Sequence, residues 1–189
     1  MRKFFTLLSE LPDASAAGHN YMLMLYALAH ASISSIHTIL EVGAGPHGTS
    51  ALAFAYVLDE IGGEHPQLVS IEISPEHPIP SALDYVREVI GVDWRIVRGD
   101  SLKVPFDQLP TVVDLLYIDG DHGGEHALGD YRRFSPLVRK GGLIVFDDYP
   151  IATGVVGAVD ALAAEGVVGV VLTYNHQDGN SHWVTRKGV

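Results

Sequence analysis

The segment from residue 36 to residue 61 constrains the fold most strongly, because it combines three local signals. An apolar run over 36–42 predicts a buried strand, and a helical pattern follows over 48–61. A glycine-rich turn, Gly43-Ala44-Gly45-Pro46-His47-Gly48, lies between them. Glycines let the backbone turn sharply and approach a ligand, and a helix start offers unpaired N–H groups. The segment therefore predicts a strand–turn–helix unit with a nucleotide-like ligand at its turn, although such turns also occur without a ligand.

Strand and helix patterns alternate along the rest of the chain. The predicted strands are 37–42, 67–73, 93–98, 112–118 and 142–147, and the predicted helices are 20–35, 48–61, 79–90, 125–138 and 154–165. Two further strand-like runs, 167–174 and 181–186, are joined by a turn containing Asp178-Gly179. We therefore expect an α/β fold: a doubly wound, mostly parallel seven-stranded sheet with a C-terminal antiparallel hairpin. The 189 residues fit one domain, with a helical extension over 1–35 and a core over 36–189.

Composition excludes several classes of function. A net charge of −11 argues against nucleic acid or an anionic membrane as partner, because both need basic patches. The chain has no cysteine, which excludes disulfides, thiolate chemistry and cysteine-ligated zinc. No apolar run reaches the roughly 20 residues that span a bilayer, and no signal peptide is evident, so we expect a cytoplasmic protein. The apolar helix over 20–35 could cover the sheet or pair with its copy in a homodimer.

Acidic residues at strand ends discriminate between nucleotide ligands. Glu41 precedes Gly43 by two residues, where dinucleotide-binding strands usually stay apolar. A carboxylate there suits a cation, and S-adenosylmethionine carries a sulfonium and an ammonium. Glu72 ends the next strand and could accept hydrogen bonds from ribose hydroxyls of either ligand, or it could simply be solvated. Asp100 follows the third strand and could accept from an adenine amino group or merely form a turn.

Four aspartates follow two strands that we expect to be neighbours. Asp119 and Asp121 come after the strand over 112–118, and the strand over 142–147 runs into Asp147 and Asp148. Parallel strands open their carboxyl ends on one edge of the sheet, so these acids should converge and repel one another unless a cation compensates. Oxygen ligands favour Mg²⁺, and we predict Asp119, Asp147 and Asp148 as its ligands. The alternative is that these acids cap helices and bind the ligand's ammonium without metal.

His122 lies three residues after Asp119, in the loop over this cluster. A histidine can accept a proton near neutral pH, and we predict that His122 removes the proton of a substrate hydroxyl. His126 follows four residues later, but no third nitrogen or sulfur ligand for zinc is evident.

The run 114–122 (DLLYIDGDH) and the run 140–149 (KGGLIVFDDY) closely resemble class I S-adenosylmethionine-dependent methyltransferases. Within this class the chain resembles the small O-methyltransferases that include macrolide-sugar and rhamnosyl enzymes. The resemblance implies a Rossmann-like fold, S-adenosylmethionine as cofactor, a divalent metal at the predicted acids and a general base at His122.

The combined prediction is methyl transfer to a hydroxyl of a small molecule. The predicted cofactor-binding residues are Glu41, Gly43, Ala44, Gly45, Gly48, Thr49, Ser50, Glu72, Asp100, Ser101, Asp119 and Asp121. Two alternatives stay open. Gly43-Ala44-Gly45-Pro46 also resembles the opening of flavin-binding or NAD-binding Rossmann oxidoreductases, and a methyltransferase-like domain could bind the cofactor without catalysis.

Overall fold

The computed structural model describes residues 29, 36–46, 48–74, 86–175 and 180–188. Its strands are β1 (Thr38–Val42), β2 (Gln67–Glu72), β3 (Asp93–Arg98), β4 (Val113–Ile118), β5 (Val138–Tyr149), β6 (Gly169–Asn175) and β7 (Asn180–Arg186). Its α-helices are α3 (Thr49–Ile61), α5 (Gly124–Phe134) and α6 (Thr153–Ala164). Three short helical turns complete the described elements: a π-helix at Val86–Ile90 and 3₁₀ turns at Phe106–Gln108 and Ser135–Leu137.

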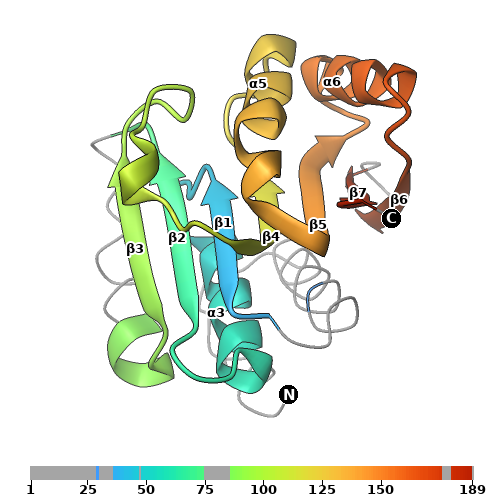
Figure 1. Cartoon of the computed structure of the whole chain (residues 1–189). Helices are drawn as coiled ribbons and strands as arrows, with labels where there is room; N and C mark the ends of the chain where they lie inside the picture. Colours follow the sequence, from blue (N-terminus) through green and yellow to red (C-terminus); the bar gives the residue numbers. More distant parts are fainter. Residues whose placement is uncertain (1–28, 30–35, 47, 75–85, 176–179, 189) are drawn as a thin grey trace.

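The seven strands form one sheet in the order β3-β2-β1-β4-β5-β7-β6. The strands from β3 to β5 pair in parallel, whereas β7 pairs antiparallel with both β5 and β6. The predicted fold, including its closing hairpin, is therefore confirmed. The chain runs outward from β1 to β3 and then returns to place β4 on the other side of β1 (Figure 1). Ligands bind at such a reversal in open α/β sheets.

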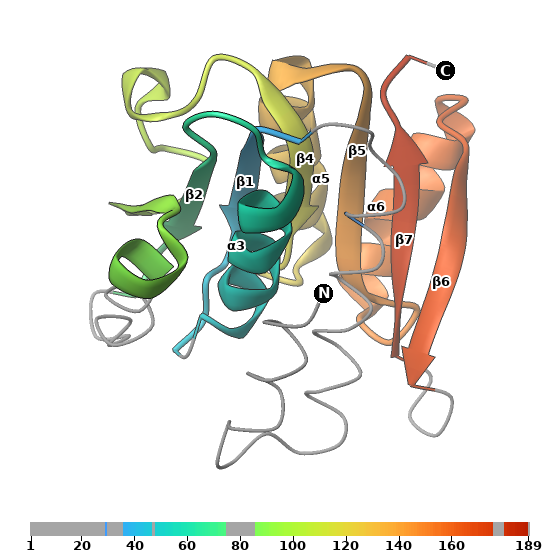
Figure 2. The same cartoon turned by 90° about the horizontal axis from the view of Figure 1, so that it is seen from below.

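Helices cover both faces of this sheet, which explains why its central strands are apolar without alternation. Helix α3 lies on one face, and α5 and α6 lie on the other (Figure 2). The first core contains Phe54 of α3 packed edge-on against Tyr117 of β4. The second core lies under α5 and α6 and includes Phe134 and Phe146. All six residues of β4 are buried, as expected for a strand covered on both faces.

Most predicted element boundaries that fall on described residues agree with the structure within two residues, but the helices over 125–138 and 79–90 and the strand over 142–147 differ. The predicted helix 125–138 ends at Phe134 and continues as a 3₁₀ turn with Pro136 near its start, after which β5 begins at Val138 and not at residue 142. The predicted helix 79–90 is described only over 86–90, where it is a π-helix. The predicted helix 20–35 lies outside the described residues except for Ala29, which is helical and buried.

No helix in the described part of the chain combines the length and apolarity needed to cross a bilayer.

Candidate active site

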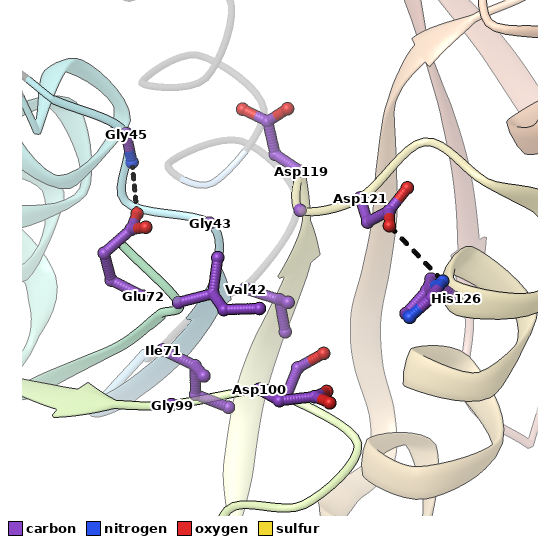
Figure 3. A pocket seen from close by; sticks show the side chains of 13 residues that line it. Val42, Gly43, Gly45, Ile71, Glu72, Gly99, Asp100, Asp119, Asp121 and His126 are labelled. Carbon is purple, nitrogen blue, oxygen red and sulfur yellow. Dashed lines mark hydrogen bonds and ion pairs between the residues drawn. The ribbon is translucent and has the colours of Figure 1, made fainter. Parts of the chain in front are cut away.

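Two neighbouring cavities open where β1, β2, β3 and β4 end. The first cavity, of about 330 Å³, is lined by Val42, Gly43, Gly45, Ile71, Glu72, Ile73, Gly99, Asp100, Ser101, Asp119, Gly120, Asp121 and His126 (Figure 3). The second cavity, of about 290 Å³, is lined by Gly43, Ala44, Gly45, Pro46, Gly48, Thr49, Ser50, Asp119, Gly120 and His122. Every residue of the predicted cofactor set except Glu41 lines one of the two cavities. The glycine turn and the end of β4 border both.

The glycine turn is held tightly between the ends of two strands. The N–H of Gly43 donates to the carbonyl of Ile71 at 2.9 Å, and the N–H of Asp119 donates to the carbonyl of Val42 at 2.9 Å. Gly43 has φ +88°, and a Cβ added to it would lie 2.0 Å from the carbonyl oxygen of Asp119. Only glycine fits this position, because any side chain would separate the turn from β4.

Glu72 connects the end of β2 to the glycine turn. Its carboxylate accepts hydrogen bonds from the N–H of Gly45 at 3.0 Å and from the N–H of Ser74 at 2.8 Å. The side chain is buried and points along the wall of the first cavity (Figure 3). Glu72 therefore shapes the turn as well as the cavity, and the sequence indicated only the second of these contributions.

Asp100 also has two functions. One carboxylate oxygen accepts from the N–H of Leu102 at 2.9 Å, which makes a local turn, and the other lies 2.7 Å from Nζ of Lys103. Both hydrogen bonds lower the pKa of Asp100 below its usual range, and the one from Lys103 has the larger effect. Asp100 is thus a turn former and a cavity-lining carboxylate together.

Glu41 is fully buried on the α3 side of the sheet and lines neither cavity. Its two carboxylate oxygens accept hydrogen bonds from the hydroxyls of Ser50 and Ser70. The indole N–H of Trp94 donates to the Ser70 hydroxyl at 2.9 Å. Glu41 therefore links three strands to the first turn of α3, and it reaches the second cavity only through Ser50.

Replacement of Glu41 by glutamine should flatten the pH dependence of stability. Burial raises the pKa of Glu41 from 4.5 to about 7. The pKa of such a carboxyl group is higher in the folded protein than in the unfolded chain. Its contribution to stability is therefore fully present when the pH is below the pKa in the unfolded chain, and it is lost as the pH rises through the pKa in the folded protein. Wild type should thus lose up to about 3 kcal/mol between pH 4.5 and pH 8 through this group. Urea unfolding of Glu41→Gln at both pH values should show a smaller loss.

The exposed Glu64 provides a matched control, because Glu64→Gln should leave the pH dependence of unfolding as it is in wild type. An equally steep pH dependence in Glu41→Gln would contradict this assignment.

His122 lies between two carboxylates at the second cavity. Its Nε2 atom is 3.5 Å from Oδ1 of Asp119, and its Nδ1 atom is 3.3 Å from Oδ2 of Asp148. The hydrogen bond with Asp119 and the charge of Asp148 raise the pKa of His122. Burial and the nearby charges of Asp147 and Asp148 raise the pKa of Asp119 to about 7. The cluster is rich in negative charge and favours a proton or another cation.

The adjacent acids Asp147 and Asp148 point to different partners. The pairing of β5 with β7 shifts register between Phe146 and Tyr149, and Asp148 has φ +53°. Such irregularities re-aim side chains at the end of a strand. Asp148 consequently approaches His122, whereas Asp147 is buried against His182.

His182 is a residue that the sequence analysis missed. It lies on β7, fully buried, with Nε2 at 3.1 Å from Oδ1 of Asp147. Burial alone would raise the pKa of Asp147, but the hydrogen bond from His182 and its charge hold that pKa below its usual range. The predicted metal set of Asp119, Asp147 and Asp148 is therefore divided. The described residues that can bring ligand atoms within 4.8 Å of one another are instead Asp119, His122 and Asp148.

Replacement of His182 by alanine should lower the free energy of unfolding by about 3 kcal/mol, because it removes the imidazole that stabilises the buried carboxylate of Asp147. Urea denaturation at pH 7 measures this change. In the background of Asp147→Asn the same replacement should cost much less, since residue 147 then carries no carboxylate charge for His182 to stabilise. Equal costs in the two backgrounds would mean that His182 acts only by packing.

His126 does not lie at the same cavity as His122. It lies on α5 and lines the first cavity, where its Nδ1 is 3.3 Å from Oδ2 of Asp121 (Figure 3). The two histidines thus border different cavities.

Comparisons with known proteins give a matching family and solved structures of similar fold. Residues 40–149 match a family described as "Methyltransferase domain". Similar solved structures include CalS11, the TDP-rhamnose 3'-O-methyltransferase of calicheamicin biosynthesis, with a TM-score of 0.74 and 18% identity over 100% of this chain and 93% of that one. An O-methyltransferase from Bacillus cereus in complex with SAH has a TM-score of 0.66 and 18% identity over 98% of this chain and 90% of that one. At these identities the likeness concerns the fold.

A curated sequence, Uncharacterized protein R132 from Acanthamoeba polyphaga mimivirus, is 49% identical over 43 residues. That match spans 23% of this chain and only 20% of the viral protein.

Proposed function

Because the chain belongs to the methyltransferase-domain family, we propose that it transfers the methyl group of S-adenosylmethionine to a hydroxyl of a small molecule. The observation that carries this proposal is the position of His122 and its two carboxylates beside the glycine turn. The names of the structural neighbours support oxygen as the acceptor, and the neighbour with bound SAH supports the cofactor.

The cofactor would extend across both cavities. Its adenosine would occupy the first cavity, with Glu72 at the ribose and Asp100 and Ser101 at the base. Its methionine end would pass the glycine turn into the second cavity, where α3 begins at Thr49 without a side-chain cap. The uncapped N–H groups of that helix suit a carboxylate, and the acids near it suit the ammonium and sulfonium.

Methyl transfer is an in-line displacement in which the acceptor oxygen forms a bond to the methyl carbon as the bond from carbon to sulfur breaks. The electron pair of the broken bond stays on sulfur and gives S-adenosylhomocysteine. His122 would take the proton of the acceptor hydroxyl, and Asp119 and Asp148 would stabilise the resulting imidazolium. The main contributions of the protein are alignment of the reactants and exclusion of water.

A divalent ion fits the same cluster. Two carboxylates and one imidazole, on Asp119, Asp148 and His122, are suitable ligands, whereas Asp147 is engaged by His182. Such an ion would lower the pKa of a bound hydroxyl. If all three residues held an ion, His122 would be a metal ligand and could not accept a proton from the acceptor. Activity in excess chelator therefore distinguishes His122 as a general base from His122 as a metal ligand.

The proposal is tested by calorimetric titration with S-adenosylmethionine and S-adenosylhomocysteine, with and without Mg²⁺ or Mn²⁺. Formation of S-adenosylhomocysteine would then be followed with a panel of diols, sugars and catechols. We expect binding of both compounds and turnover of a hydroxylated acceptor. A thermal shift with NAD or flavin and none with S-adenosylmethionine would instead support the oxidoreductase alternative. Binding without turnover across the panel would support a non-catalytic domain.

A further inference from the structure

Gly154 lies in the first turn of α6, where that helix touches the loop that carries His122. A Cβ added to Gly154 would lie 2.1 Å from the carbonyl oxygen of His122, 2.5 Å from the nitrogen of Gly124 and 2.9 Å from the carbonyl carbon of Gly123. All three atoms belong to the backbone and cannot turn aside as the end of a flexible side chain can. Because carbon atoms pack at about 3.5–4.0 Å, an added methyl group would have to push the loop away by about 1 Å or more.

The backbone conformation of Gly154 does not itself require glycine. The residue is helical, and its φ is not in the left-handed region. Inside a helix alanine is more favourable than glycine, because it loses less conformational freedom on folding. The close approach of the His122 loop therefore explains the glycine at this position, whereas the path of α6 does not.

A hydrogen-bonded turn ties Gly154 to the end of β5. The carbonyl of Asp148 accepts from the N–H groups of Ile151 and Ala152, both at 2.9 Å. The carbonyl of Ala152 accepts from the N–H of Val156, in α6, at 3.0 Å. Asp148 and the first turn of α6 are thus held in one unit.

The loop of His122 is held to the start of α5 in a similar way. The N–H of Gly123 donates to Oδ1 of Asp121 at 2.7 Å. The carbonyl of Gly123 accepts from the N–H groups of His126 and Ala127, both at 3.0 Å. The loop and the first turn of α5 therefore form a second unit, which lies beside the first because α5 and α6 pack together (Figure 1).

His122 contacts the unit of β5 and α6 in two places. Its imidazole Nδ1 lies 3.3 Å from Oδ2 of Asp148, and its carbonyl lies directly against Gly154. The contact at Gly154 determines how closely the two backbones approach. It therefore also determines where the imidazole lies at the second cavity, although Gly154 lines neither cavity.

We propose that Gly154 is a positioning residue that seats the His122 loop against the end of β5 and so places the imidazole for its reaction with the acceptor. This inference rests on the proposed function, in which His122 takes the proton of the acceptor hydroxyl. A displacement of about 1 Å can lower the rate of an enzymatic step by about 10²-fold. A methyl group at Gly154 should therefore affect the chemical step without touching the cofactor.

The test compares alanine variants of three glycines in single-turnover formation of S-adenosylhomocysteine, with the panel compound that wild type methylates. Gly154→Ala should lower the rate at least about 30-fold, whereas the dissociation constant of S-adenosylhomocysteine should change by less than about threefold. Gly124→Ala meets the same contact from the other side, with its Cβ 3.3 Å from the carbonyl oxygen of Gly154, and should lower the rate by only about three- to tenfold.

Gly157→Ala is the matched control on the same helix. A Cβ added to Gly157 would meet no heavy atom of the described residues within 4 Å, so the variant should keep the wild-type rate and be at least as stable to urea.

A double-variant cycle separates positioning of His122 from packing of the helices. In the background of His122→Ala, Gly154→Ala should lower the remaining rate by less than about threefold, because the side chain that it displaces is gone. An equal loss in both backgrounds, or a wild-type rate in folded Gly154→Ala, would overturn the inference. If Gly154→Ala failed to fold, a wild-type rate in Gly124→Ala would overturn it.

A measurement without turnover keeps this inference distinct from the proposed function. The imidazole Cε1–H signal of His122 is assigned in the nuclear magnetic resonance spectrum by its loss in His122→Ala. The signal should shift in Gly154→Ala and stay in place in Gly157→Ala, and an unmoved signal in Gly154→Ala would overturn the inference. Absence of methylation by wild type would contradict the proposed function, whereas the signal would still test how Gly154 positions the imidazole.

Discussion

Replacement of His122 by alanine should lower the rate of methyl transfer by about 10²- to 10⁴-fold, because the acceptor hydroxyl loses its proton acceptor. The dissociation constant of S-adenosylhomocysteine should change by less than threefold, since the imidazole borders the second cavity and not the first, where the adenosine would lie under the proposed function. Single-turnover formation of S-adenosylhomocysteine at pH 7.5 measures the rate, and calorimetry measures the binding.

His65→Asn is the matched control for this experiment. His65 is exposed, and its φ of +55° is one that asparagine tolerates, so the rate should equal that of wild type. If His122→Ala kept more than a tenth of the wild-type rate, proton removal by this residue would be excluded. If chelator also abolished wild-type activity and Mn²⁺ restored it, His122 would be assigned as a metal ligand.

The sequence was sufficient to predict the sheet and most of the two cavities, because both follow from short-range patterns. Apolar runs that end in glycine or acid identify the carboxyl ends of parallel strands, and those ends must meet at one edge. Gly43, Glu72 and Asp100 could therefore be assigned to the cavity edge from their places after β1, β2 and β3 alone.

The partners of the buried carboxyl groups could not be predicted in this way. Asp147 and Asp148 are adjacent in sequence, and their divergence depends on a register shift and a positive φ that no local pattern indicates. His182 reaches Asp147 only because β7 inserts next to β5. The sequence predicts that Glu41 faces a cation, whereas its carboxylate accepts hydrogen bonds from Ser50 and Ser70. These contacts arise between distant segments, so they require the three-dimensional arrangement.

Alanine substitutions at the first two glycines of the turn, Gly43 and Gly45, should have different effects: the first should lower stability and the second should lower cofactor affinity. At Gly43 the added Cβ would lie 2.0 Å from the Asp119 carbonyl, on backbone that is fixed by hydrogen bonds to β2 and β4. Gly43→Ala should therefore cost at least about 4 kcal/mol of unfolding free energy, a large part of a typical domain's stability. Urea denaturation and circular dichroism would detect a largely unfolded or strongly destabilised protein.

At Gly45 the same methyl group would meet no heavy atom within 4 Å, although φ is +61°. Gly45→Ala should cost only about 1–2 kcal/mol of stability, from the left-handed backbone. Its methyl group enters the space that both cavities share, so the affinity for S-adenosylhomocysteine should fall at least tenfold if the cofactor passes there. A folded Gly45→Ala protein with wild-type affinity would place the cofactor elsewhere, whereas a stable Gly43→Ala protein would show that the turn can move away from β4.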